Sequence, residues 1–326
     1  MNHRKTKKNL KTRNKKSKRQ TNKHFQSKIE KGGGNQYKTN HEVRKQLNLN
    51  LINNMRINFT QGAYNYDSSK VDEVLKVMLH IDRGDFCKDT RERCYYDGAN
   101  VIAHQGETET GDHATISAPH MHFIAIYELF DKLKPGNKVL DIGSGSGYLT
   151  ACFAQLLDTS KNTISKAIGV DVVSKLVRDS VVNINKNHSH LFNRANLQMV
   201  CGNGWEGYQV YQKYDAIHVG ATVGDGMVPK ALWNQLKPGG ILFAPIRLDS
   251  NVESETIFII TKPSSCLDKS SGCQVTHCND LLQKLKVSGE AKISNEFCHI
   301  KKMMNVRYVL LRKNQRLKEV RSTRQI

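Results

Sequence analysis

Residues 138–150 (KVLDIGSGSGYLT) contain the residue types of a ligand-binding turn. A short apolar run, broken by Asp141, precedes three glycines at alternate positions, and a second apolar run follows them, which predicts a buried strand, a tight turn and a helix. Glycine lets the backbone approach a ligand closely, and a helix start offers free N–H groups and a positive dipole end. The stretch therefore predicts a site for an anion or a polar ligand around Gly143, Gly145 and Gly147.

The spacing within this stretch differs from the dinucleotide fingerprint, which is G-x-G-x-x-G with an acid about 20 residues later. Here the glycines follow G-x-G-x-G, and the next acid at a strand end, Asp171, comes 28 residues after Gly143. Asp141 could bind an ammonium group, the turn a carboxylate, and Asp171 ribose hydroxyls. Those three groups together favour S-adenosylmethionine over a pyrophosphate. A plain strand–helix turn, or a site for another nucleotide, stays open on these residues alone.

A second cluster of polar side chains occurs in residues 114–122 (ATISAPHMH), directly after a long segment without periodicity. Pro119 suits the first position of a helix and forces Ala118 into an extended conformation, so we expect a helix over 119–133. Thr115, Ser117 and two histidines then crowd the start of that helix. Such a cluster after a long loop indicates either a functional site or a group of capping residues.

The elements that must position both clusters alternate along the chain. Strands separated by helices predict an α/β fold, a doubly wound and mostly parallel sheet, in which ligands bind beyond the carboxyl ends of the strands. Four turns fall at such ends, at Gly143, Asp171, 202–204 and 218–221. An apolar helical pair in 49–80 would cover this core. We expect strands at 138–142, 166–171, 197–201, 214–219, 240–246, 255–261 and 304–311, and helices at 147–157, 174–185 and 228–236.

The net charge of +20 belongs to the two ends of the chain. Residues 1–45 carry 16 Lys/Arg against 2 Glu, and residues 306–326 carry 7 against 1, whereas the middle balances at 27 against 27. Residues 1–48 have too few apolar side chains to offset the entropy of folding, so we expect a disordered tail. Its basic clusters favour a nuclear address or weak, salt-sensitive contact with nucleic acid, and a solvated tail without a specific partner remains an alternative.

The eight cysteines contain no C-x-x-C pair, so we predict no metal site. No run is long and apolar enough to span a bilayer, and no secretory segment is evident. We therefore expect a cytoplasmic protein, with a nuclear address compatible with the basic tail, whose cysteines are reduced.

Several segments resemble the protein-L-isoaspartate (D-aspartate) O-methyltransferase family. TISAPHMH is the specific motif, whereas the glycine turn alone is typical of the wider class of S-adenosylmethionine-dependent, Rossmann-like methyltransferases. The resemblance implies a methyltransferase domain over 49–312 with an N-terminal helical cover and a surface insertion at 262–296, flanked by basic tails at 1–48 and 313–326. The matching segments are 51–86, 115–122, 139–156, 214–221, 228–240 and 306–311.

The resemblance implies transfer of a methyl group from S-adenosylmethionine to the carboxylate of L-isoaspartyl residues in damaged proteins, which initiates their repair. The expected partners are isoaspartyl-containing proteins and peptides, and the expected state is a monomer. Ser117 corresponds to the family's active-site serine. Together with Asp141, Gly145 and Gly147 from the turn itself, the residues expected to bind the methyl donor are Ala114, Thr115, Ile116, His122, Gly143, Ser144, Asp171, Val172, Asn203 and Gly204.

The chemistry of this reaction suits these residues. A carboxylate is already ionised at neutral pH, so its attack needs alignment and partial desolvation rather than a general base. Ser117 would orient the carboxylate, and His122 would line the pocket. Asn203 stands where the family has an acid, which predicts weaker donor binding, and Arg312 replaces a ligand-binding threonine. These departures leave an alternative open, namely a donor-binding but catalytically weak scaffold tethered by its basic tails.

Overall fold

The computed structural model describes residues 40–62, 66–88, 92–108, 110–111, 113–158, 165–194, 197–211, 213–224, 226–248, 255–266, 274–288, 292–296, 298–308 and 311. The chain divides into two units between Val43 and Arg44, and every arrangement below lies within the second, Arg44–Ile326.

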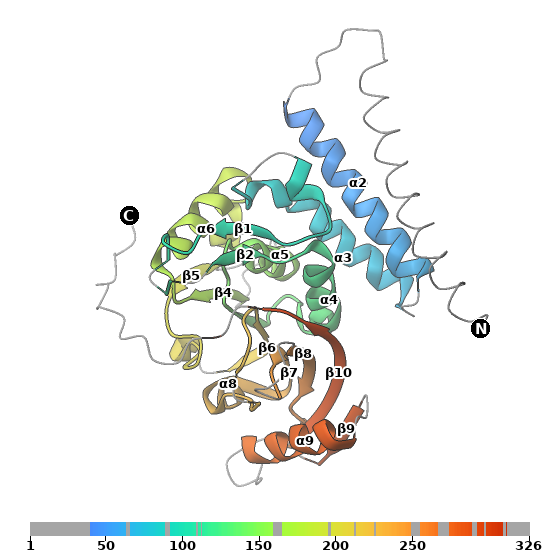
Figure 1. The fold of residues 1–326 in the computed structure, drawn as a ribbon, viewed down its shortest axis with the longest axis vertical. Helices are drawn as coiled ribbons and strands as arrows, with labels where there is room; N and C mark the ends of the chain where they lie inside the picture. The colour runs from blue at the N-terminus through green and yellow to red at the C-terminus, as the bar shows by residue number, and fades with distance from the viewer. Residues whose placement is uncertain are drawn as a thin grey trace, which may run out of the picture. The chain divides into compact units, whose positions relative to one another are not determined.

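A central eight-stranded sheet organises this unit (Figure 1), with the strand order β5-β4-β3-β6-β7-β8-β10-β9. Continuous apolar runs form its central strands, as expected where helices cover both faces. The predicted doubly wound, mostly parallel sheet is confirmed. Its strands are β3 (Lys138–Ile142), β4 (Lys166–Asp171), β5 (Gln198–Cys201), β6 (Tyr214–Val219), β7 (Leu236–Ile246), β8 (Glu255–Thr261), β9 (Lys292–Asn295) and β10 (Cys298–Val306).

Strands β3 to β7 run parallel to one another. From β3 the chain moves outward through β4 to β5 and then returns to β6 on the other side of β3. The strand order therefore reverses between β3 and β6, and a crevice opens beyond the carboxyl ends of strands at such a switch point. This is where the predicted turns at Gly143, Asp171, 202–204 and 218–221 come together.

The remaining strands are antiparallel and correct two expectations. β10 pairs with both β8 and β9, so the last strand begins at Cys298 and ends at Val306 rather than covering 304–311. Residues 262–296, expected to be a surface insertion, instead supply the edge strand β9 and the helix α9 (Val275–Ser288). The apolar side of α9, which includes Leu282 and Leu285, is fully buried and packs into the core, which the polar sequence around it concealed.

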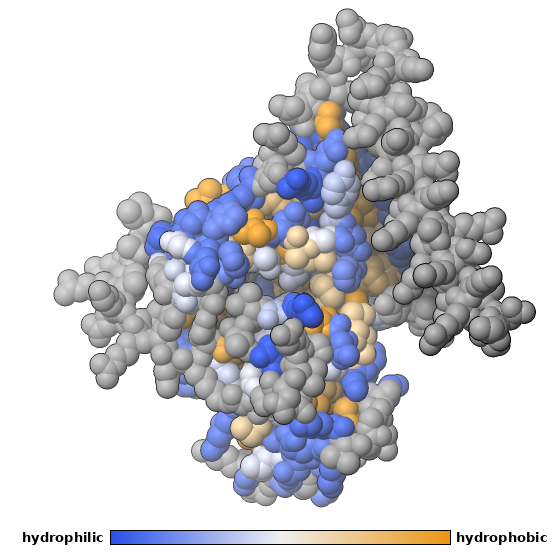
Figure 2. Space-filling model, viewed as in Figure 1, coloured by the Kyte–Doolittle hydropathy of each residue, from blue (hydrophilic) through white to orange (hydrophobic). Residues whose placement is uncertain are grey.

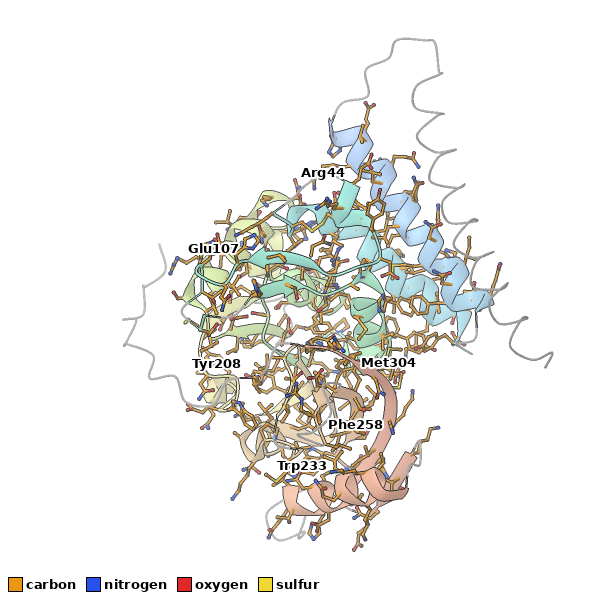
Figure 3. The ribbon with its side chains drawn as sticks, viewed as in Figure 1. Arg44, Glu107, Tyr208, Trp233, Phe258 and Met304 are labelled. Atoms are coloured by element: carbon orange, nitrogen blue, oxygen red, sulfur yellow. A yellow bond between two sulfur atoms is a disulfide. The ribbon has the colours of Figure 1, made fainter. Side chains whose placement is uncertain are left out.

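Alternate residues along each central strand face two different cores, following the period-2 geometry of a strand. Val139, Ala216 and Phe243 belong to the core on one face, whereas Leu140, Ile217 and Leu242 belong to the core on the other. Trp233 and Phe258 of the second core are labelled in Figure 3. The first core is covered by α3 (Ser68–His80), α4 (Pro119–Leu129), α5 (Tyr148–Leu157), α6 (Ser174–Asn187) and α7 (His190–Arg194), and the second by α8 (Lys230–Gln235) and α9.

The N-terminal cover begins earlier than the sequence predicted. Helix α2 spans Asn40–Gln61, so the expected disordered tail at 1–48 is wrong for its last nine residues, and residues 1–39 lie outside the described part of the chain. Asn48 is 4% exposed and donates from Nδ2 to the Leu79 carbonyl at 3.1 Å, and Arg44 binds Asp82 and Asp85 at 3.0 and 2.7 Å. Tertiary hydrogen bonds therefore order a segment that its own composition would leave unfolded.

The segment 82–114, expected to be one long loop, contains short elements. Two 3-10 turns, η1 (Arg83–Asp85) and η2 (Glu92–Tyr95), precede an antiparallel pair of strands, β1 (Asn100–Ala103) and β2 (Ala114–Ile116). Three- and four-residue strands carry too little alternation to be recognised from sequence. This small sheet places Thr115 and Ser117 at the mouth of the switch-point crevice.

The expectation of reduced cysteines is wrong for several of them, whereas Cys152 and Cys201 form no disulfide. Disulfides join Cys87 to Cys94 and Cys278 to Cys298, whose Cα atoms lie 6.2 and 5.5 Å apart, within the range that a disulfide requires. Spacings of 7 and 20 residues do not reveal such proximity, because it arises from the packing of η1 on η2 and of α9 on β10.

The surface drawn in Figure 2 is mainly hydrophilic, with hydrophobic residues in small separate patches. Within the described ranges, no helix combines the length and apolar character needed to cross a membrane.

Candidate active site

A cavity of about 630 Å³ opens beyond the carboxyl ends of β3, β4 and β6, and a smaller one of about 40 Å³ adjoins it. Both are lined by Thr115, Ser117, Gly143 and Gly145. Of the other residues predicted from sequence, the larger cavity is lined by Ala114, Asp171, Val172 and Gly204, and the smaller by Ile116, His122, Asp141 and Ser144. Gly147 and Asn203 line neither.

The glycine turn has the backbone geometry that its composition indicates. Gly143, Gly145 and Gly147 have φ angles of 72°, 51° and 83°, which residues with a Cβ rarely adopt. At Gly147 an added Cβ would also lie 2.9 Å from the Ser180 Cβ, so this glycine allows α5 to pack on α6.

The N–H groups of the turn bind within the protein, contrary to the expectation of a free anion cradle. Gly143 N donates to the Val170 carbonyl at 2.8 Å, and Gly145 N donates to the Asp171 carboxylate at 2.9 Å. The turn is therefore braced against β4, and what it offers a ligand is mainly close backbone approach.

Asp171 ends β4 with both carboxylate oxygens engaged by backbone. Oδ2 accepts from Gly145 N and Oδ1 accepts from Val173 N, each at 2.9 Å. The residue is 8% exposed and lies on the wall of the larger cavity. A carboxylate held by two N–H groups is fixed in orientation, and its remaining lone pairs can accept hydrogen bonds from a diol.

Asp141 lies beneath the turn in a buried hydrogen-bond network. Its Oδ2 accepts from the Thr150 hydroxyl at 2.5 Å, and its Oδ1 lies 2.8 Å from Nδ1 of His218. The carboxylate is 1% exposed, and His218 lines the smaller cavity beside it. Sequence reasoning placed His218 only in a strand-end turn, because nothing in the spacing shows that β6 pairs with β3 at this register.

Ser117 lies between the two cavities and is hydrogen bonded to Tyr308. Burial raises the pKa of Tyr308 to about 12, against the opposing effect of the Ser117 hydrogen bond, so the phenol is neutral at pH 7. The main-chain N–H of Tyr308 donates to Glu255 at 3.2 Å. Tyr308 is thus a site residue that the sequence motifs did not single out.

The C-terminal end of the described chain closes one side of the larger cavity. Residues 304–308 and Leu311 line it, beginning at Met304 of β10, which Figure 3 labels. Leu311 N donates to the Thr222 carbonyl at 2.7 Å, and the Trp205 indole donates to the Leu311 carbonyl at 3.0 Å. These two bonds fasten the segment over Gly204. Arg312 lies outside the described residues.

The two histidines of the α4 start have different surroundings. The main-chain N–H and Nδ1 of His120 lie 3.0 and 2.8 Å from Asp97 Oδ1, so Asp97 caps the helix. His122 is 7% exposed, and burial, with the nearby Arg83 guanidinium, lowers its pKa well below the ordinary value. His122 is therefore neutral at pH 7.

Asn203 does not reach the cavity. Its Oδ1 accepts from Trp205 N at 3.1 Å, and its Nδ2 donates to Glu206 at 3.0 Å, so the side chain closes a local turn. Gly204 lines the cavity instead, and a Cβ there would lie 2.5 Å from Cγ2 of Ile142 and 2.9 Å from Cδ1 of Leu311. Asn203 therefore lines neither cavity, and its contact with a donor molecule stays a prediction.

Further lining residues come from the segment between β1 and β2. Thr108, Thr110 and His113 contribute to the larger cavity. Gly220 and Ala221, after β6, line it next to Gly143.

The cavities suit a molecule with an amino-acid end and a nucleoside end. The larger has the size of a typical ligand pocket and an acid, Asp171, on its wall. The smaller contains the Ser144 hydroxyl, a buried group without a hydrogen-bond partner, together with His122 and Asp141. A buried orphan hydroxyl indicates a missing polar partner. In the described part of the chain, no cluster of three His, Cys, Asp or Glu residues is arranged to hold a metal ion.

Comparison with known proteins places this site in a family. Residues 58–278 match the family model of protein-L-isoaspartate(D-aspartate) O-methyltransferase (PCMT). The chain belongs to this family. Its relatives include protein-L-isoaspartate O-methyltransferase 1 of Arabidopsis thaliana, 44% identical over 187 residues, which are 57% of this chain and 75% of the relative. The Caenorhabditis elegans protein-L-isoaspartate O-methyltransferase is 37% identical over 208 residues, 63% of this chain and 80% of the relative.

Solved structures agree with this assignment to the PCMT family. A Plasmodium falciparum protein, described as a protein-L-isoaspartate O-methyltransferase and crystallised with S-adenosyl-L-homocysteine, has a TM-score of 0.58 and 28% sequence identity. The match covers 83% of this chain and 99% of that chain.

Proposed function

We propose that this protein transfers a methyl group from S-adenosylmethionine to the free α-carboxylate of L-isoaspartyl residues in damaged proteins, and so initiates their repair. Membership in the PCMT family supports the reaction class. The observation that carries the proposal is the position of Ser117, on the wall shared by both cavities and beside the glycine turn.

The residues at this wall suit carboxyl methylation. S-adenosylmethionine supplies an activated methyl group on a sulfonium centre. The acceptor carboxylate is ionised at pH 7, so the site needs no general base. Ser117 can donate its hydroxyl hydrogen to one carboxylate oxygen and thereby direct the other oxygen to the methyl group. Most of the catalytic effect then comes from alignment and from excluding water.

The donor would lie across both cavities. We propose that its ribose hydroxyls bind Asp171 and that its amino-acid end occupies the smaller cavity near Ser144 and His122. Ala114, Thr115, Ile116, Val172 and Gly204 would contact the rest of the molecule. Asp141, whose oxygens already accept from Thr150 and His218, would act mainly by its buried negative charge near the donor ammonium.

Replacement of Ser117 by alanine tests the proposal. Losing the orienting hydrogen bond should lower kcat on an isoaspartyl peptide by roughly 10²-fold, the order expected for misplacement of a reacting group. The dissociation constant for S-adenosyl-L-homocysteine, measured by calorimetry, should stay within about twofold of wild type. An equal loss of donor affinity would place Ser117 in the donor site and contradict the proposed role. Tyr308→Phe is the companion variant, since it removes only the hydroxyl bonded to Ser117.

One observation favours the second candidate, a donor-binding scaffold with weak turnover. Asn203 replaces the family's acid and is bonded to Trp205 and Glu206 rather than lining the cavity. Donor binding by calorimetry without methyl transfer to any isoaspartyl peptide would support this candidate over the first.

We also propose a monomeric, cytoplasmic enzyme, with a nuclear address compatible with the basic tail, whose basic ends bind nucleic acid weakly. The charge distribution supports the last point, because residues 1–45 alone carry 16 Lys/Arg against 2 Glu. Deleting residues 1–39 and 312–326 together should abolish salt-sensitive binding to an RNA or DNA oligonucleotide. Binding that survives the deletion would contradict the proposed nucleic-acid contact. Light scattering measures the molar mass and so tests whether the protein is a monomer.

A further inference from the structure

Arg83 is a buried cation beside the active site that no part of the proposed mechanism uses. It belongs to η1 and is 1% exposed. Its Nε donates to the Cys94 carbonyl at 2.9 Å, Nη2 donates to the Gly98 carbonyl at 3.4 Å, and Nη1 lies 3.1 Å from Nδ1 of His122. Among the described residues, no carboxylate lies within ion-pair distance of its guanidinium. Burying a cation in this way is costly, so its retention calls for a reason.

The contact with His122 determines which imidazole nitrogen carries the proton. A guanidinium has five N–H donors and no acceptor. Nη1 must therefore donate, and Nδ1 of His122 must accept with its lone pair. A neutral imidazole with an unprotonated Nδ1 carries its hydrogen on Nε2. Arg83 thus selects one of the two tautomers of His122.

The selected hydrogen is available to a ligand. His122 lines the smaller cavity, and in the part of the chain that the structure describes its Nε2 has no hydrogen-bond partner. The orphan hydroxyl of Ser144 lines the same cavity. Two groups able to donate hydrogen bonds therefore share one small polar space. Such a pair suits a carboxylate.

The surroundings of His122 keep the ring neutral. Burial is the main cause that lowers the pKa of His122, and the guanidinium of Arg83 and the rings of His218 and His120 act in the same direction. From α5, Tyr148 packs against the ring at 4.8 Å and Cys152 bonds to Tyr148, and burial raises the pKa of both groups, so neither carries a negative charge at neutral pH. Two acids of this region are engaged with other histidines, since Asp97 binds His120 and Asp141 binds His218.

We propose that Arg83 is a positioning residue that holds His122 as the neutral Nε2–H tautomer, so that His122 donates a hydrogen bond into the smaller cavity. The inference rests on the proposed function in one respect, that the acceptor is the carboxylate at the amino-acid end of the methyl donor. Arg83 touches neither substrate and acts only through His122.

The tautomer can be measured without any ligand. In protein labelled with ¹⁵N-histidine, long-range ¹H–¹⁵N spectra distinguish a protonated from an unprotonated ring nitrogen, and a His122→Gln variant assigns the signals. Wild type should show the Nε2–H tautomer throughout pH 5.5–8.5. Arg83→Met should show a mixture of tautomers, or protonation of His122 within that range. Arg83→Lys, which keeps a cationic donor, should restore the wild-type tautomer at least in part.

Lys262→Met is the matched control. Lys262 is also a buried cation, 6% exposed, that donates to two backbone carbonyls, those of Trp233 and Leu236. Both of these residues belong to the core on the other face of the sheet. Its loss should leave the His122 signals unchanged even where it lowers stability to a similar degree. A wild-type His122 in the Nδ1–H form, or an Arg83→Met spectrum like that of wild type, would overturn the proposal.

Binding of S-adenosyl-L-homocysteine supplies the functional readout. Arg83→Met should weaken binding by roughly two- to fivefold, because only the molecules in the Nε2–H tautomer donate the hydrogen bond, and Arg83→Lys should recover most of that loss. Equal affinity in wild type and Arg83→Met would refute the link to the donor. The spectra can be recorded without any methyl transfer, so the two proposals can fail separately. If His122 shows the expected tautomer but no methyl transfer occurs, the proposed function is contradicted and the role of Arg83 is not.

Discussion

Asp171→Asn should weaken binding of the methyl donor more than any other change of a single atom in the site. The native carboxylate accepts Gly145 N on one oxygen and Val173 N on the other, each at 2.9 Å, and lines the larger cavity. Asparagine keeps one acceptor oxygen, and its NH₂ group then faces one of the two N–H groups instead of accepting from it.

The size of the effect follows from these contacts. A hydrogen bond to a charged group contributes about 1.5–3 kcal/mol. If the ribose hydroxyls donate to Asp171, the dissociation constant for S-adenosyl-L-homocysteine should rise by roughly 10- to 150-fold. The lost bond to the turn should lower the free energy of unfolding by about 1–3 kcal/mol. Calorimetry measures the first quantity and urea denaturation the second.

Asp215→Asn separates the two effects. The Asp215 carboxylate also accepts a backbone N–H, that of Lys138 at 2.8 Å, and pairs with Lys237, but it lies at the opposite ends of β3 and β6. This variant should lose stability and keep donor affinity. Donor affinity of Asp171→Asn within twofold of wild type, or an equal loss of affinity in Asp215→Asn, would refute the reasoning.

Two further predictions concern stability. Gly147→Ala places a Cβ at a φ of 83° and 2.9 Å from the Ser180 Cβ, so it should lower the unfolding free energy by about 2–5 kcal/mol in urea denaturation. In Gly136→Ala the added Cβ has no heavy atom within 4 Å, so only the strain of a φ of 91° remains, and the unfolding free energy should fall by about 1–2 kcal/mol. Equal losses of unfolding free energy in the two variants would contradict the packing argument. Burial and the nearby Lys213 lower the pKa of Lys262 from 10.5 to about 8. Between pH 8 and 10.5 the unfolded chain therefore keeps a proton on Lys262 that the folded chain has released. Because the unfolded state binds more protons there, the unfolding free energy rises with pH. The unfolding free energy of Lys262→Met relative to wild type should therefore fall across that range, and a difference independent of pH would show that Lys262 keeps an ordinary pKa.

The central sheet could be predicted from sequence because its strands are buried on both faces and appear as apolar runs. The expected strands at 138–142, 166–171, 214–219 and 255–261 match the observed bounds. β7 begins four residues before the expected position, because Pro238, Gly239 and Gly240 read as a turn but lie within the strand. The local pattern of apolar residues was thus sufficient to predict the strands that are buried on both faces.

Features that depend on tertiary contact could not be predicted. The start of α2 is fixed by Arg44 with Asp82 and Asp85, and the Cys87–Cys94 disulfide by the packing of η1 on η2. Asn203 bonds to Trp205 N in a local turn instead of lining the cavity. The spacing of residues in the sequence does not show which of these two positions the side chain takes. Arg83 is only one charged residue in a polar loop until the structure places it against His122.

The central claim is that the carboxylate produced by isoaspartyl linkage is the acceptor. Two peptides that differ only in an aspartyl or isoaspartyl linkage, incubated with the full chain and methyl-labelled S-adenosylmethionine, test it most directly. We predict label on the isoaspartyl peptide, at least 10²-fold less on the aspartyl peptide, and loss of most of the signal in Ser117→Ala, on the order that alignment of a reacting group contributes. Equal labelling of both peptides, or none of either while a related enzyme labels the isoaspartyl one, would contradict the account.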